Sequence, residues 1–229
     1  MALDPVFPVP VAKNSGEFNR RENDVVIRLL QAVSLCYARI YHKVIVYKRC
    51  RLPHRGPAIL VCNHTSGLDP TLIQSVCPRL IRWMMAKEYF EVKPLRWIFN
   101  SVGVILVERS GRDMAATRSA MRALENGYVL GVFPEGKIAT TDELLSFQSG
   151  IGLLALKTGA PVYPAFLGGS QRGKAMVEAF IWPNKAAISF GPPVDLSGIE
   201  ATRKGIEEAT RRIEAAVADL RAQQLQKKP

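Results

Sequence analysis

Short apolar runs alternate with amphipathic stretches along most of this 229-residue chain. The apolar runs are rich in Val, Ile, Leu and Phe and have the length of buried strands; they cover 58–62, 81–86, 104–107, 128–133, 162–166 and 187–190. The stretches between and after them have helical spacing and cover 70–76, 94–99, 112–125, 151–157 and 203–224. This alternation predicts a single α/β domain in which helices flank a mostly parallel or mixed central sheet.

The first residues of the chain have a different pattern. Residues 1–23 are rich in proline, polar and charged residues and lack an apolar core long enough for a secretory signal peptide, so we expect a flexible arm. Residues 24–46 have the apolar spacing of one helix, interrupted by charge too often to span a bilayer. Its apolar stripe consists of Val26, Leu29, Leu30, Val33, Tyr37, Ile40, Tyr41 and Val44. Such a helix either packs on the domain's own core or lies in a membrane interface.

The chain is strongly basic, with a formal net charge of +11. Lys48, Arg49 and Arg51 lie between Lys43 and Arg55 with no acidic residue among them. A basic run beside an amphipathic helix is typical of a segment that binds anionic lipid. A nucleic-acid partner is not expected, because the basic residues are not interleaved with aromatic residues in any reader pattern. We therefore expect an anionic membrane surface as partner and a peripheral or monotopic place on the cytoplasmic side of a membrane, with the amphipathic helix as the membrane-association segment.

The cysteines and histidines do not have the patterns of a metal site or a disulfide framework. Cys36, Cys50, Cys62 and Cys77 show no CxxC spacing, which favours a reducing compartment. The three histidines are widely separated, and acidic residues do not group around them. We expect no metal and no cofactor.

The polar stretch 63–69, Asn-His-Thr-Ser-Gly-Leu-Asp, follows the first predicted strand of the domain and precedes a predicted helix. Ligand sites of open α/β sheets form at the carboxyl ends of the strands. Asp69, five residues after His64, can keep one imidazole nitrogen protonated, so that the other can take a proton from a hydroxyl. An ordinary surface histidine fits the same pattern, because His and Asp occur at this spacing by chance in many chains.

Three further stretches lie at or near the ends of predicted strands. Phe-Pro-Glu-Gly at 133–136 makes a sharp turn that places Glu135 at the same sheet edge, where a carboxylate can bind a polyol or an amide. The stretch 103–109 ends in Arg109, whose planar fork suits a phosphate or a carboxylate. Pro-Val-Tyr-Pro at 161–164 is the last of the three. Taken singly, the glutamate also fits a plain turn and the arginine a solvated surface residue.

In order and spacing, these four stretches resemble the four sequence blocks of the glycerolipid acyltransferase family, which includes the 1-acylglycerol-3-phosphate acyltransferases. The resemblance runs from about residue 47 to about 190. Four blocks in sequence are far more specific than the H-x-x-x-x-D motif alone. They divide the chain into the arm 1–23, the amphipathic helix 24–46 and an acyltransferase domain 47–229.

The resemblance implies a role for each matching residue. His64 is then the general base that activates the free hydroxyl of the acceptor, and Asp69 orients it. Arg109 is implied to bind the phosphate of the acceptor, and Glu135 with Gly136 to position the acceptor. The blocks and the segment between the first two also imply supporting residues, which are Asn63, Ser66, Lys87 and Pro134.

The implied reaction moves a fatty acyl group from a thioester, acyl-CoA or acyl-carrier protein, to the free hydroxyl of a lysolipid. The simplest acceptor is 1-acylglycerol-3-phosphate, which would give phosphatidic acid in phospholipid biosynthesis. A thioester is already activated, so deprotonating the alcohol, holding it in line and stabilising the oxyanion suffice.

One departure from the family pattern bears on the acceptor. Many members continue Phe-Pro-Glu-Gly with Thr-Arg-Ser, whereas Lys137-Ile138-Ala139 follows here. Lys137 can supply a charge to a substrate phosphate, but it lacks the bidentate fork of arginine. The acceptor is then lysophosphatidic acid held by fewer charges, or another lysolipid such as a lyso-aminolipid or a lysophospholipid. A non-catalytic membrane-binding protein on this scaffold is the remaining alternative, against which the presence of both His64 and Asp69 argues.

Overall fold

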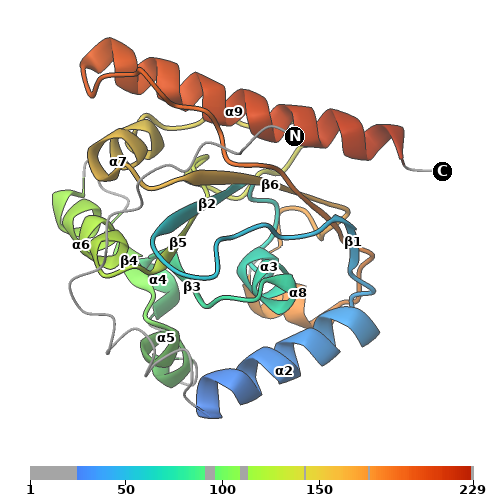
Figure 1. The fold of residues 1–229 in the computed structure, drawn as a ribbon. Coiled ribbons are helices and arrows are strands. Elements are labelled where there is room, and N and C mark those ends of the chain that lie inside the picture. Colours follow the sequence, from blue (N-terminus) through green and yellow to red (C-terminus); the bar gives the residue numbers. More distant parts are fainter. Residues whose placement is uncertain (1–24, 91–95, 109–112, 142, 175, 228–229) are drawn as a thin grey trace.

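The computed structural model describes residues 25–90, 96–108, 113–141, 143–174 and 176–227 (Figure 1). The predicted arm, 1–23, lies outside these residues. The described chain has a central sheet with helices on both faces, as the sequence predicts.

A seven-stranded sheet with the order β1-β7-β6-β2-β5-β3-β4 forms the centre. Its strands are β1 Ile45–Lys48, β2 Ala58–Cys62, β3 Ile81–Ala86, β4 Ile105–Val107, β5 Val129–Val132, β6 Val162–Gly168 and β7 Ala187–Phe190. Strand β2 pairs in parallel with both β5 and β6, and β3 pairs in parallel with β5 and β4. The sheet is mixed because β7, which pairs in parallel with β1, runs antiparallel to β6.

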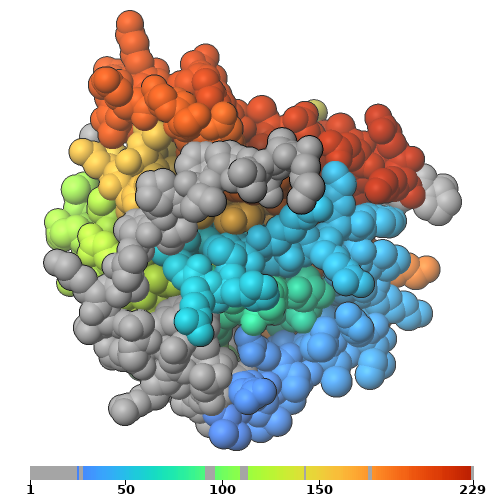
Figure 2. Space-filling model, in the orientation of Figure 1, coloured from blue at the N-terminus to red at the C-terminus, as the bar shows by residue number. Residues whose placement is uncertain are grey.

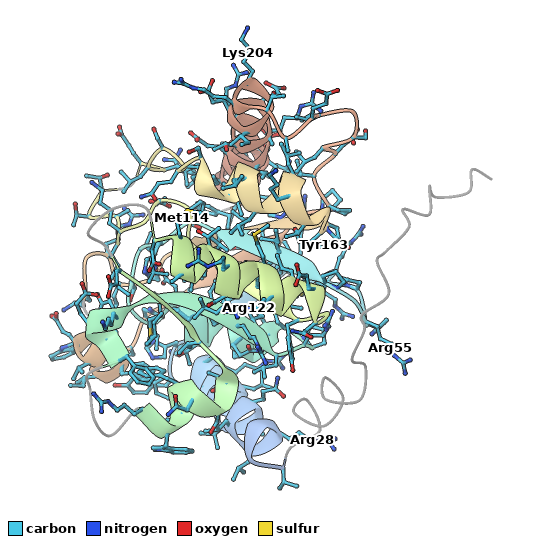
Figure 3. All side chains as sticks on the ribbon, turned by 90° about the vertical axis from the view of Figure 1, so that its left-hand side faces the viewer. Arg28, Arg55, Met114, Arg122, Tyr163 and Lys204 are labelled. Carbon is cyan, nitrogen blue, oxygen red and sulfur yellow. The ribbon has the colours of Figure 1, made fainter. Side chains whose placement is uncertain are left out.

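Helices cover both faces of the sheet. They are α2 Val25–Ile40, α3 Asp69–Val76, α4 Lys87–Phe90, α5 Arg96–Val102, α6 Met114–Glu125, α7 Gly150–Thr158, α8 Met176–Ile181 and α9 Arg203–Gln226. Helices α6, α7 and α9 lie on one face, and α2, α3 and α8 lie on the other (Figure 1). Figure 3 shows these layers from the side, with Lys204 on α9 at one end and Arg28 on α2 at the other.

Strand β2 is buried on both faces, which explains its continuous apolar sequence. Ile59 and Val61 pack into the core beneath α6, α7 and α9, whereas Leu60 and Cys62 pack into the core beneath α2 and α3. Successive side chains of a strand point to opposite faces, so a central strand covered on both sides needs apolar residues throughout. The polar residues that follow Cys62 therefore mark the end of the buried strand.

The helix predicted over 24–46 is shorter in the structure. It ends at Ile40, and Ile45–Lys48 forms β1 beside β7. Lys43 has a φ of 45°, a left-handed conformation that no helix continues through. Apolar residues continue past Lys43 because they belong to β1. Ile45 and Val46 of this strand are β-branched and favour a strand over a helix. The short helices α4 and α8, of four and six residues, are too brief to show a helical period and were not predicted.

Candidate active site

Strands β2 and β5 bring two of the four motifs to one edge of the sheet. The strands are parallel neighbours, so the residues after Cys62 and after Val132 leave the sheet on the same side. The backbone N–H of His64 donates to Oε1 of Glu135 at 3.0 Å, and the N–H of Ala139 donates to the carbonyl oxygen of His64 at 2.7 Å. The predicted meeting of the His64 and Glu135 motifs is confirmed.

The side chains of His64 and Asp69 form a pair at this edge. Nδ1 of His64 lies 3.0 Å from Oδ2 of Asp69, the first residue of α3. The same oxygen accepts the backbone N–H groups of Thr65 at 2.6 Å and Ser66 at 2.8 Å. An ionised carboxylate only accepts hydrogen bonds, so Nδ1 must carry the proton and Nε2 keeps its lone pair. Asp69 is fully buried and the His64 side chain is 15% exposed, which leaves the imidazole within reach of a substrate.

A stack of three rings fixes the plane of the imidazole. The His64 ring lies on Phe133 at a centroid distance of 4.1 Å, and Phe133 lies on Trp83 at 4.7 Å, with interplanar angles of 13° and 10°. Gly131 on β5 makes room for this stack, because a Cβ there would come within 2.5 Å of the Trp83 ring and 2.6 Å of Ile81. The imidazole is therefore held at one nitrogen by Asp69 and on one face by Phe133.

Asn63 and Ser66 shape the backbone around the pair. Asn63 is buried and extends the β2–β6 pairing, since its Nδ2 donates to the Leu167 carbonyl oxygen at 2.9 Å and its Oδ1 accepts the Leu167 N–H at 2.8 Å. Ser66 Oγ accepts the N–H of Leu68 at 3.3 Å. These contacts close the turn that leads from β2 into α3.

Glu135 is buried, with an exposed fraction of 5%. The pKa of its carboxyl is raised to about 7, chiefly by burial and to a smaller extent by the negative charge of Asp69, while the hydrogen bond from the N–H of His64 acts in the opposite direction. Gly136 follows with a φ of 72°, and a Cβ there would lie 2.2 Å from Nε2 of Gln148. The turn of Pro134, Glu135 and Gly136 is thus tightly built, and the positive φ at position 136 favours glycine.

The sequence model of the Acyltransferase family matches residues 43–168, more than half of the chain. The chain belongs to this family. The 1-acyl-sn-glycerol-3-phosphate acyltransferase of Bacillus subtilis is 27% identical over 150 residues, which are 65% of this chain and 72% of that protein. Its namesake of Borreliella burgdorferi is 29% identical over 147 residues, which are 62% of this chain and 57% of that protein.

A solved structure has the same fold as this acyltransferase. It is the crystal structure of the 1-acyl-sn-glycerophosphate (LPA) acyltransferase PlsC of Thermotoga maritima, with a TM-score of 0.67 and 22% sequence identity. The match covers 86% of this chain and 80% of that chain. The family predicted from the four motifs and the mixed α/β fold are confirmed.

The structure does not bring every predicted residue of the acyltransferase to the His64 pair. Arg109 lies outside the described residues. Lys87 is 59% exposed and forms an ion pair with Glu108 at 3.0 Å, and Lys137 is exposed. The roles of Arg109 and Lys137 in substrate binding, and of Lys87 as a supporting residue, stay predictions.

Several residues at the site were not predicted. Phe133 and Trp83 form the ring stack, and Thr65 hydrogen-bonds to Asp69 and Ser170. Arg172, in the loop after β6, lines a small cavity together with Thr65 and Glu135. The signal in the sequence was a glycine-rich basic segment, Gly-Gly-Ser-Gln-Arg-Gly-Lys at 168–174, directly after a strand. Over the described ranges, no three or more His, Cys, Asp and Glu side chains are grouped to hold a metal ion.

The raised pKa of Glu135 predicts how stability depends on pH. An unfolded glutamate ionises near 4.5 and the folded one near 7, so between these values the folded state keeps a proton that the unfolded state has released. The contribution of neutral Glu135 to stability is full below about pH 4.5 and is lost as the pH rises through about 7. Between about pH 5 and pH 8 the free energy of unfolding of the wild type should fall by about 1–2 kcal/mol relative to Glu135→Gln, allowing for solvent screening.

Urea unfolding of both proteins at the two pH values measures this difference. A carbon-13 NMR titration of the Glu135 carboxyl supplies the pKa directly. A stability difference that stays constant over this range would contradict the raised pKa.

Proposed function

We propose that this chain is an O-acyltransferase that moves a fatty acyl group from a thioester to the free hydroxyl of lysophosphatidic acid and so forms phosphatidic acid in phospholipid biosynthesis. The observation that carries the proposal is the His64–Asp69 pair, in which Nδ1 is held 3.0 Å from the carboxylate and Nε2 is left as the base. The names of the relatives and the four motifs support the same substrate class. Acyl-CoA and acyl-carrier protein are both suitable donors.

His64 would perform two proton transfers in this reaction. Nε2 takes the proton of the acceptor hydroxyl as its oxygen attacks the thioester carbonyl, and a tetrahedral oxyanion forms. Collapse of this intermediate breaks the carbon–sulfur bond and expels a thiolate, which receives the proton from the imidazolium. Asp69 stabilises the imidazolium between the two steps. No covalent acyl-enzyme is required, because the thioester is already an activated donor.

The acceptor's phosphate needs cations, and Arg172 is a candidate in the described part of the chain. It follows β6 and lines the cavity that Thr65 and Glu135 also line. Two backbone hydrogen bonds connect its loop to the His64 turn. The N–H of Gly173 donates to the Thr65 carbonyl oxygen at 3.0 Å, and the N–H of Gly67 donates to the Lys174 carbonyl oxygen at 3.1 Å. Arg172 would thereby offset the arginine that this chain lacks after Gly136.

The first experiment measures acyl transfer from acyl-CoA and acyl-carrier protein to lysophosphatidic acid in anionic vesicles. The substitution His64→Ala should lower the rate by about 10²–10⁴-fold, because it removes the general base. The matched control is His54→Ala, at an exposed histidine before β2, which should keep the wild-type rate.

The other outcomes separate the alternatives. Transfer to another lysolipid, with none to lysophosphatidic acid, would show that the acceptor is assigned wrongly. A folded wild-type protein that acylates no lysolipid would support a non-catalytic role.

Arg172→Gln tests the phosphate contact. A lost charge-assisted hydrogen bond should raise the KM for lysophosphatidic acid about 10-fold, with little change in kcat or in the KM for the acyl donor. Arg203→Gln, at a 94% exposed arginine at the start of α9, is the control and should leave both constants unchanged. An unchanged KM in Arg172→Gln would remove Arg172 from the acceptor site.

We further propose that α2 and α8 form the face that binds an anionic membrane surface. The predicted stripe of the helix is divided in the structure: Leu30 and Tyr37 turn inward and are half-buried. A second set of apolar residues, spaced three or four positions apart, faces solvent, and it comprises Val25, Leu29, Val33, Cys36 and Ile40. An apolar stripe that the fold leaves exposed is suited to insertion between lipid headgroups. In the described chain, no helix is both long and apolar enough to cross a membrane.

Helix α8 extends this apolar face. The ring of Tyr37 stacks on Phe180 at 5.7 Å, and its hydroxyl donates to the Phe180 carbonyl oxygen. Ile181 and Trp182 follow, exposed by 60% and 58%. Figure 2 shows α2, in blue, at the lower edge of the molecular surface, and Figure 3 shows Arg28 on α2 at the same end of the molecule. Apolar residues bordered by arginines support a peripheral or monotopic place on the cytoplasmic leaflet, where anionic lipids are found.

Replacing Leu29 and Val33 by serine in one variant tests this face. Their side chains make no large contribution to the core, so the variant should fold, while binding to anionic vesicles falls at least about 10-fold. The control Leu225→Ser changes a 52% exposed leucine of α9, on the opposite layer, and should bind as the wild type does. Unchanged co-sedimentation of the double variant with vesicles would contradict the proposed face.

A further inference from the structure

Two cysteine thiols face each other beside the active-site helix. Cys50 lies in the segment after β1, and Cys77 is the C-terminal cap of α3, the helix that begins at Asp69. Their Sγ atoms are 3.4 Å apart, with the Cys77 thiol donating to the sulfur of Cys50. The acyl-transfer chemistry proposed above uses neither thiol.

The two thiols differ in access and in chemical character. Cys77 is buried, with an exposed fraction of 6%, and Cys50 is partly exposed. The hydrogen bond from Cys77 lowers the pKa of Cys50, while burial raises the pKa of Cys77 well above its usual range. Cys50 is therefore the nucleophile that solvent can reach, and Cys77 is the buried, protonated thiol next to it.

We propose that Cys50 and Cys77 form a peroxide-sensitive thiol pair that closes a reversible disulfide. The Cys50 thiolate attacks a hydroperoxide and breaks its O–O bond, which gives Cys50 sulfenic acid and, after protonation, an alcohol or water. The sulfur of Cys77 then attacks the sulfenic sulfur and the hydroxyl leaves as water. The peroxide is the two-electron oxidant, and the two thiols are oxidised to one disulfide.

The geometry makes this reaction possible without rebuilding the fold. A disulfide needs a sulfur–sulfur distance of about 2.05 Å, so the two atoms must approach by about 1.4 Å, which side-chain rotation and small backbone shifts provide. The closed loop would contain β2, the His64 turn and α3. A cross-link around this region restricts the unfolded chain, so the oxidised protein should unfold at a temperature about 5–10 °C higher than the reduced one.

The other two cysteines provide internal controls. Cys62 is fully buried in β2 and burial raises its pKa, so it should not react. Cys36 is exposed on α2 and would cross-link molecules to each other. Cys36→Ser is therefore the background for every measurement.

The experiment treats the reduced 229-residue protein with hydrogen peroxide and maps the products by peptide mass spectrometry. The expected product is a Cys50–Cys77 disulfide with a mass loss of about 2 Da, a higher unfolding temperature, and reversal of both by dithiothreitol. In Cys77→Ser, dimedone should trap the sulfenic acid at Cys50; in Cys50→Ser, no adduct should form at Cys77.

The mapping of the wild-type cysteines decides the proposal even if a variant fails to fold. If both Cys50 and Cys77 can still be alkylated after peroxide treatment, no disulfide has formed and the proposal is overturned. Dimedone labelling of Cys77 in Cys50→Ser would overturn the assigned order of reaction. Neither result depends on acyl transfer, so failure of this proposal and failure of the proposed enzyme activity are distinguishable.

Discussion

The carboxylate of Asp69 accepts hydrogen bonds from the imidazole of His64 and from the backbone N–H groups of Thr65 and Ser66, all through one oxygen. A fully buried carboxylate without such partners would cost several kcal/mol. The chain between β2 and α3 must therefore take the one path that brings these donors together. The same path leaves Nε2 of His64 without a proton, so the requirement that stabilises the buried charge also prepares the proposed base.

The neighbours of β2 in the sheet complete the site. On one side, β5 ends in the turn that carries Phe133 beneath the imidazole and Glu135 against the His64 N–H. On the other side, the Asn63 side chain donates to the Leu167 carbonyl oxygen of β6, and the N–H of Gly173 in the loop after β6 donates to the Thr65 carbonyl oxygen. The geometry of the His64–Asp69 pair thus depends on a central strand with a parallel neighbour on each side. This explains why motifs far apart in the sequence meet at one sheet edge.

Most of the sheet and the centre of the site could be predicted from the sequence. Continuous apolar runs mark central strands such as β2 and β5, because a strand covered on both faces needs apolar residues throughout. The polar motifs after these strands then had to share an edge. The stack of Phe133 on Trp83 could not be predicted, because it depends on the register of β3 against β5 and on the missing side chain of Gly131.

Three other features could not be predicted from the periodicity of the sequence. The spacing of residues in α2 gives an apolar stripe, but not which side packs on α3 and which side faces solvent. The end of the helix before β1 was missed because the apolar pattern continues through the left-handed turn at Lys43. Arg172 lies near the site because two backbone hydrogen bonds hold its loop against the His64 turn.

Nitrogen-15 NMR of the His64 ring tests the central claim most directly. In the neutral form of the ring, Nδ1 should carry the proton and Nε2 should be unprotonated. In Asp69→Asn this preference should be lost, because an amide can donate to Nδ1 as well as accept from it. A wild-type spectrum with the proton on Nε2 would contradict the account, since the nitrogen that faces the substrate would then have no lone pair for the hydroxyl proton.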